Sequence, residues 1–328
     1  MHLILRFTSR ALTLVVCACP FLAHAGSIRD DVDEQVYLDF AANHPFSDAV
    51  AILETTVGGA GFASTATLIS PTQVLTAAHP FLDLGPNLEI EGIATSAQVT
   101  FGVSNISDLS GAITRSVSSV DLLFEPVPAG SPGFIAVDLA IINLAEPVFG
   151  IDPAPLILGT LPTLPPGSAF FSQTVGYGQF GNGADGITGG FGVQRGGRNL
   201  AFEVTGVNDF LFVNHDDPAN NPDPLVDSPS LAEEYTPLPG DSGSGLWLED
   251  AEQNPLGIVG VTSFGFTAED GAELGQYGTV AGYSLIGPFI TLNDEGIVSF
   301  VPEPATVSLW LGLAALAGAW IRRRVRQA

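Results

Sequence analysis

Short apolar runs separated by turn-forming residues constrain the fold of this chain more than any other feature. Examples are Ala49–Val57, Phe62–Ile69, Gln98–Val103 and Leu139–Leu144, with Gly, Pro, Asn and Asp between them. Glycine and proline are abundant, with 38 and 24 residues, and no long segment has the periodicity of an amphipathic helix. The pattern predicts an all-β chain folded as a sandwich or a barrel.

The N-terminal segment, residues 1–25, has the pattern of a secretory signal peptide. Two arginines precede the apolar stretch Ala11–Leu22, which is followed by Ala23-His24-Ala25. We expect signal peptidase to cut after Ala25. A permanent membrane anchor is the alternative, but the apolar stretch is short for a membrane span. Both cysteines of the chain lie in this segment, so the exported mature chain would have no disulfide.

The body of the chain is strongly acidic. Of the ten basic residues, two lie in the signal segment and four near the C-terminus, so residues 26–304 carry four basic and 35 acidic side chains, a net charge of −31. Such a surface excludes nucleic acid as a partner and favours solubility outside the cell. Residues 214–227 are rich in oxygen ligands, which raises calcium binding as an alternative. Their spacing matches no EF-hand and their prolines indicate a solvated loop, so the sequence predicts no metal and no other cofactor.

The stretch Pro239-Gly240-Asp241-Ser242-Gly243-Ser244-Gly245 places a serine between glycines, directly after an acid. Gly240 has no Cβ, so it can adopt a backbone conformation that brings its N–H beside that of Ser242. Two such donors aimed at one point would form an oxyanion hole. A flexible surface linker is the alternative. The run is short, however, and the apolar residues Leu246-Trp247-Leu248 follow it, which indicates a buried turn.

Two further segments supply partners for that serine. His79 ends the apolar segment Leu75-Thr76-Ala77-Ala78-His79, and Asp138 is a lone acid inside the apolar run 134–142. A buried carboxylate needs a partner. A carboxylate that accepts the imidazole N–H, with the imidazole facing a serine hydroxyl, is the arrangement used for nucleophilic acyl transfer. His44 and His215 lie in polar, proline-flanked stretches, and we expect both to be solvated.

These three motifs together resemble the trypsin/chymotrypsin-like serine peptidases. The segments T-A-A-H, D-L-A and G-D-S-G-S occur in the order His, Asp, Ser that this family uses, and the resemblance covers roughly residues 28–291. It implies two antiparallel β-barrels with the active site in the cleft between them. Residues 26–155 would form the first barrel and carry His79 and Asp138, and residues 156–296 would form the second and carry Ser242. The implied activity is that of a secreted serine endopeptidase acting on a polypeptide substrate.

The resemblance also implies a set of substrate-pocket residues. The position six before the nucleophile, at the floor of the pocket in the family, is Thr236 rather than an acid, although Glu233 and Glu234 are close. Of the remaining candidates, Ser263, Phe264 and Gly265 match the segment that forms the pocket wall, and Gly265 and Gly275 would leave the pocket open. These residues predict a preference for a small or medium apolar side chain before the cut bond.

The activation route stays open on the sequence. In many relatives a newly cut N-terminus that starts with Ile or Val pairs with the acid before the nucleophile, and Asp241 matches that acid. Ile28 is a candidate partner. The usual I-V-G-G motif is missing, however, and a cut after Ala25 leaves two residues in front of Ile28. A second cut, or activation without an ammonium group, would be required.

The C-terminal segment, residues 297–328, resembles the PEP-CTERM sorting signal of Gram-negative bacteria. It contains the triplet Pro302-Glu303-Pro304, an apolar stretch over residues 305–321 and the basic cluster Arg322-Arg323-Arg324. The stretch is at the short end for a transmembrane helix, with the arginines on the cytoplasmic side. The resemblance implies transient anchoring in the inner membrane, processing by an exosortase-type enzyme and delivery to the cell surface or extracellular polymer. A permanent C-terminal anchor is the alternative.

Two function classes are consistent with the sequence. The first is the secreted endopeptidase described above. The second is a non-catalytic surface or matrix binding protein that keeps the peptidase fold. The complete set of His79, Asp138, Ser242 and Gly240 favours the enzyme, because a non-catalytic protein has no need of all four.

Overall fold

The computed structural model describes residues 2–6, 26–86, 88–126, 135–162, 164–165, 168–204, 207–219, 230–267, 273–294 and 296–301. Within these residues β-strands predominate, as predicted. The helical elements found there are short: α1 (Glu34–Asn43) and the 3₁₀ helices η1 (Ser47–Ala49) and η2 (His79–Phe81). Asp33 caps α1, because its side chain accepts a hydrogen bond from the Gln35 N–H at 2.8 Å.

The first barrel is a closed antiparallel sheet of six strands. In spatial order they are β9 (Ile113–Pro126), β10 (Ile135–Leu144), β5 (Gln73–Thr76), β4 (Ala60–Ser70), β3 (Val50–Val57) and β8 (Ser96–Phe101), and β8 pairs with β9 to close the ring. Its interior is apolar and includes Leu53, Leu68, Phe81 and Phe101. Strand β1 (His2–Arg6), within the segment predicted to be a signal peptide, pairs with β9 on the outside of this ring.

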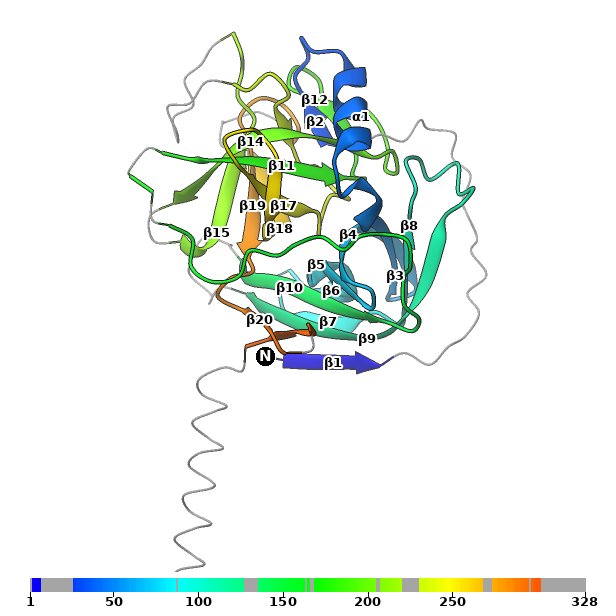
Figure 1. Cartoon of the computed structure of the whole chain (residues 1–328). Helices are drawn as coiled ribbons and strands as arrows, with labels where there is room; N and C mark the ends of the chain where they lie inside the picture. The colour runs from blue at the N-terminus through cyan, green and yellow to red at the C-terminus, as the bar shows by residue number, and fades with distance from the viewer. Residues whose placement is uncertain are drawn as a thin grey trace, which may run out of the picture.

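The second barrel is also closed and antiparallel, with six strands. Their order is β11 (Phe170–Gly176), β14 (Arg195–Val204), β15 (Val207–Asn214), β19 (Thr279–Leu285), β18 (Pro255–Thr267) and β17 (Gly245–Glu249). Leu211, Leu246, Val259 and Tyr283 lie in its core. Figure 1 shows the two barrels packed together, which confirms the predicted architecture of two β-barrels.

Apolar residues of both barrels form one shared cluster where the barrels meet. Leu139 and Ile141 of β10 pack there with Trp247 of β17 and with Ile258 and Val261 of β18. All five side chains are fully buried. The packing therefore brings β10 and the end of β5 next to the start of β17, and these are the places where Asp138, His79 and Ser242 occur in the sequence.

Each end of the folded body packs on the barrel formed by the other half of the chain: the N-terminal segment on the second barrel and the C-terminal hairpin on the first. Strand β2 (Gly26–Ile28) pairs with β12 (Phe180–Asn182) and β16 (Tyr235–Thr236), and β12 also pairs with β13 (Gly186–Ile187). Helix α1, which the predicted boundaries placed with the first barrel, packs on β14 of the second barrel, and its Ala41 also joins Val50 and Ile52 of β3 in a buried cluster. Burial of the apolar side chains of Ile28 and Tyr37 against Tyr235 explains the difference.

The C-terminal hairpin packs at the junction on the side of the first barrel. Strands β20 (Ile290–Leu292) and β21 (Val298–Phe300) form this hairpin, and the Gln73 side chain of β5 bonds both the N–H and the carbonyl of Val298, at 2.8 and 2.9 Å. The folded body thus continues into the segment that was predicted to serve for sorting alone. A second small sheet, β6 (Leu82–Leu84) with β7 (Ile90–Ile93), follows η2.

The predicted targeting elements lie largely outside the described residues. This holds for the apolar stretch of the signal segment, for the triplet Pro302-Glu303-Pro304, for the helix over 305–321 and for Arg322, Arg323 and Arg324. In the part of the chain that the structure describes, no helix has the length and apolar character needed to cross a membrane.

The prediction that His44 and His215 are solvated is wrong, since their exposed fractions are 5% and 1%. His44 lies at the junction of the barrels, where its ring is 4.9 Å from that of Trp247 and Phe46 stacks on the same indole at 5.2 Å. Burial lowers the pKa of His44 to about 4. The apolar residues that surround it, and not its polar neighbours in sequence, determine its environment.

We expect His44 to make the folded chain sensitive to acid. Its pKa falls from an unfolded value near 6.5 to about 4, so its contribution to stability is complete above pH 6.5 and is lost as the pH falls towards 4. The free energy of unfolding of the wild type should fall, relative to that of His44→Asn, by up to about 3 kcal/mol over this window. Urea denaturation of both proteins from pH 7 to 4 measures the difference. Identical pH profiles would contradict the expectation.

Candidate active site

The structure brings His79, Asp138 and Ser242 together between the barrels. His79 Nδ1 lies 2.7 Å from Asp138 Oδ2, and His79 Nε2 lies 2.9 Å from Ser242 Oγ. His79 opens η2 directly after β5, Asp138 is in β10, and Ser242 is in the turn before β17. An ionised carboxylate can only accept, so Nδ1 carries the ring proton and Nε2 is free to accept the proton of the serine hydroxyl.

Asp138 is fully buried and is held by donors from two segments, Ala78–His79 and Ser263 of β18. Its Oδ1 accepts the N–H groups of Ala78 and His79, at 2.7 and 2.9 Å, and its Oδ2 accepts the hydroxyl of Ser263 at 2.6 Å besides the imidazole. Burial raises the pKa of this carboxyl, but the charge of His79 and these hydrogen bonds outweigh burial and hold the pKa below its ordinary value of 3.8. The group is therefore ionised at neutral pH.

The turn around Ser242 is fixed by Thr65 of β4. The Thr65 N–H donates to the carbonyl of Ser242, and the Thr65 hydroxyl donates to the carbonyl of Gly240, both at 3.0 Å. Gly240 and Gly243 have positive φ, +97° and +87°, a conformation that glycine adopts without strain. Among the described residues, the N–H groups of Gly240 and Ser242 donate to no acceptor. Both remain available for an oxyanion beside Ser242 Oγ.

Ser263 has a role that the sequence did not reveal. It was predicted to line the substrate pocket, but its hydroxyl donates to Asp138. No local pattern marks this contact, because 125 residues separate the two partners. Phe264 packs with Phe210 and Phe212, at ring distances of 5.3 and 6.2 Å, while Gly265 next to it is exposed.

The other two predicted pocket residues do not present open surface. Thr236 has an exposed fraction of 0%, and it pairs with Ser27 across β16 and β2. Gly275 is buried, and a Cβ there would lie 3.2 to 3.3 Å from the backbone of Gly186 and Ile187 and from Leu238. The missing side chain at Gly275 thus allows close packing against β13, which differs from the predicted role of leaving a pocket open.

The acid before the nucleophile, Asp241, is also buried, but not against Ile28. Its carboxylate accepts the N–H groups of Gly178 and Leu238, at 2.8 and 2.9 Å, and the hydroxyl of Tyr235 at 3.2 Å. Ile28 lies within β2, paired with Asn182 and Tyr235. Burial raises the pKa of Asp241 to about 6, because these donors and the charge of Arg195 offset it only in part.

The calcium alternative gains no support from the part of segment 214–227 that the structure describes. Residues 220–227 lie outside the described residues. In the rest of the described chain, no group of three or more His, Cys, Asp or Glu side chains is arranged so that it could hold a metal ion. Asp216 accepts from the Asn214 side chain, and its N–H donates to Glu234.

Comparison with known proteins adds no relative. No family model matches the chain, and no curated protein matches its sequence. The geometry of the site is therefore the basis for proposing a function.

We expect Gly243→Ala to destabilise the fold more than an equivalent change in open space. A Cβ at Gly243 would lie 2.0 Å from Thr76 Oγ1 and 2.2 Å from the Thr65 carbonyl, so the turn must move. Gly111 is the matched control, because its φ of +82° is similar and nothing lies within 4 Å of its Cβ position. Gly243→Ala should cost about 1–3 kcal/mol more than Gly111→Ala in urea denaturation. Equal losses would show that the turn relaxes freely.

Proposed function

We propose that this chain is an exported serine endopeptidase, which hydrolyses peptide bonds through an acyl-enzyme intermediate. The observation that carries the proposal is the position of the His79 ring between an ionised, buried Asp138 and the hydroxyl of Ser242, at 2.7 and 2.9 Å. Nucleophile, base and orienting carboxylate within hydrogen-bond reach of one another constitute a catalytic triad.

Each group has a defined task in this reaction. Ser242 Oγ attacks the substrate carbonyl while His79 Nε2 takes the hydroxyl proton, and the same proton then passes to the leaving amine. Water then attacks the acyl-enzyme in the same way: His79 takes a proton from the water and passes it to Ser242 Oγ, which leaves as the acid product is released. Asp138 keeps the ring proton on Nδ1 and stabilises the imidazolium, and the Gly240 and Ser242 N–H groups bind the oxyanion.

Export and sorting form part of the same proposal. Residues 1–25 would direct the chain to signal peptidase, and residues 302–324 would deliver it to an exosortase-type enzyme after transient anchoring in the inner membrane. The net charge of −31 over residues 26–304 fits a soluble enzyme at the cell surface or in extracellular polymer. A non-catalytic binding protein is the second candidate, and the burial of Thr236 and Gly275 at the predicted pocket favours it.

A fluorophosphonate probe separates the two candidates, because it reacts covalently only with an activated serine. We expect the wild type to be labelled at Ser242 and Ser242→Ala to show no labelling, with Ser110→Ala, which changes an exposed serine, as the matched control. Mass spectrometry of the labelled peptide identifies the site. A folded wild type that takes up no label would exclude the peptidase and leave the binding protein.

We expect cleavage after small or medium apolar side chains. Neither Thr236, which is buried and uncharged, nor Glu234, whose carboxylate accepts the N–H groups of Leu231 and Asp216, offers a partner to a basic side chain. A Lys or Arg side chain would therefore lose its hydration without gaining a partner. In a panel of chromogenic peptides, kcat/KM should be at least about tenfold higher after Ala, Val or Leu than after Arg or Lys. Cleavage restricted to Arg and Lys would overturn this expectation.

A further inference from the structure

Asp241 links the oxyanion turn to the interior of the second barrel. Its N–H donates to the Leu238 carbonyl at 2.9 Å, and its carboxylate accepts the Leu238 N–H at 2.9 Å, so the loop Leu238–Asp241 is closed at both ends. The Ser244 N–H donates to the Asp241 carbonyl at 2.8 Å. Because Asp241 lies between Gly240 and Ser242, anchoring its carboxylate restrains the backbone that carries the N–H groups of these two residues.

The Tyr235 hydroxyl is the one side-chain donor among the hydrogen bonds to this carboxylate in the described chain. Burial raises the pKa of Tyr235 well above its ordinary value, so the hydroxyl keeps its proton and can only donate to the carboxylate. The backbone of Gly178 also packs closely against this carboxylate, since a Cβ at Gly178 would lie 2.4 Å from Asp241 Oδ2. The carboxylate therefore has little room to move while Tyr235 is in place.

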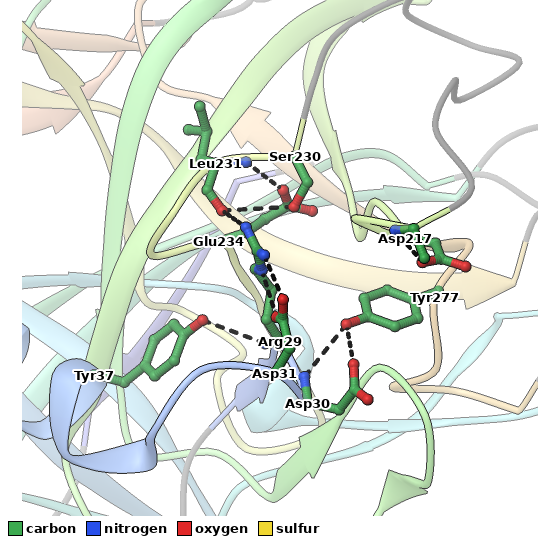
Figure 2. A network of polar contacts seen from close by, with 10 residues as sticks. Arg29, Asp30, Asp31, Tyr37, Asp217, Ser230, Leu231, Glu234 and Tyr277 are labelled. Atoms are coloured by element: carbon green, nitrogen blue, oxygen red, sulfur yellow. Dashed lines mark hydrogen bonds and ion pairs between the residues drawn. The ribbon is translucent and has the colours of Figure 1, made fainter.

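The N-terminal segment passes directly over Tyr235. A Cβ at Gly26 would lie 2.1 Å from the Tyr235 ring and 2.3 Å from its hydroxyl. The chain is then fastened further along, where the Arg29 guanidinium donates to the Leu231 carbonyl at 2.8 Å and the Tyr277 hydroxyl bonds Asp30 (Figure 2). These contacts hold the segment without any group that a cut after Ala25 would create.

We propose that the Tyr235 hydroxyl holds Asp241, and through it the turn Gly240–Ser242, in the conformation in which the Gly240 and Ser242 N–H groups can bind an oxyanion. Activity then needs no newly cut N-terminus. Tyr235 is thus a positioning residue and makes no contact with the reacting atoms. The proposal rests on the proposed peptidase function. The competing possibility is that cleavage after Ala25 frees a Gly26 ammonium group, which takes over Asp241 and switches the enzyme on.

The first experiment compares the chain that keeps residues 1–25 with the processed wild type, which has lost them. Ala25→Tyr removes the small residue that signal peptidase requires, so residues 1–25 stay attached. In detergent, the fluorophosphonate should label Ser242 of this chain within about threefold of the rate for the processed wild type. Labelling that begins only once residues 1–25 are removed would overturn the proposal and support the ammonium. If neither chain is labelled, the peptidase function fails and this proposal fails with it.

The second experiment removes the hydroxyl itself. Tyr235→Phe should lower kcat by about tenfold or more and leave KM within about twofold, because the lost donor faces a carboxylate that orients the oxyanion hole. Affinity for a peptidyl boronic acid, whose oxyanion occupies the hole, should fall in parallel with kcat/KM.

Tyr37→Phe is the matched control for this variant. Tyr37 lies in the same buried cluster as Tyr235, but its hydroxyl accepts the Arg29 N–H, at 3.3 Å, and does not face Asp241. It should therefore keep wild-type kcat and boronic acid affinity. Unchanged kcat in Tyr235→Phe, or an equal loss in both variants, would show that the hydroxyl serves stability alone and would overturn the proposal.

Discussion

The buried carboxylate of Asp138 is the interaction on which the site depends. A charge inside an apolar strand is costly unless donors surround it, and here they come from Ala78 and His79 at the start of η2 and from Ser263 of β18. Because Ser263 belongs to the second barrel and His79 to the first, the same carboxylate joins the barrels and orients the ring. Removing a donor would therefore affect the relative position of the barrels as well as the tautomer of His79.

A second buried carboxylate, Asp241, precedes Ser242 in the chain, and its environment differs from that of Asp138. Asp138 has the imidazole at 2.7 Å, and its pKa is below the ordinary value. Asp241 has amide and hydroxyl donors, with no ion pair to any of the described residues, and burial raises its pKa to about 6. In the proposed function, Asp138 would therefore stabilise the charge of the imidazolium, whereas Asp241 would hold the shape of the turn around Ser242.

The sequence predicted the features that local patterns encode. Thr76–His79, Asp138 in its apolar run and the glycine-flanked Ser242 each need particular neighbours, so each leaves a signature. No local pattern marks the hydrogen bond from Ser263 to Asp138 or the one from Tyr235 to Asp241, because these partners come together only in the folded chain. Burial of Thr236 and of Gly275 was missed for the same reason: β2 and β13 cover these residues, and no property of the residues themselves indicates that.

The site depends on both end segments of the folded body, because each packs on the barrel formed by the other half of the chain. The N-terminal segment 26–43 completes the surroundings of Tyr235 on the second barrel, and the C-terminal hairpin 290–300 is fastened to β5 beside the segment that carries His79. Each half of the site thus relies on a segment from the opposite end of the chain. Contacts between segments so far apart in the sequence carry a larger loop-closure entropy cost than local ones. The juxtaposition of the imidazole and the hydroxyl therefore depends on both barrels and on both end segments of the folded body.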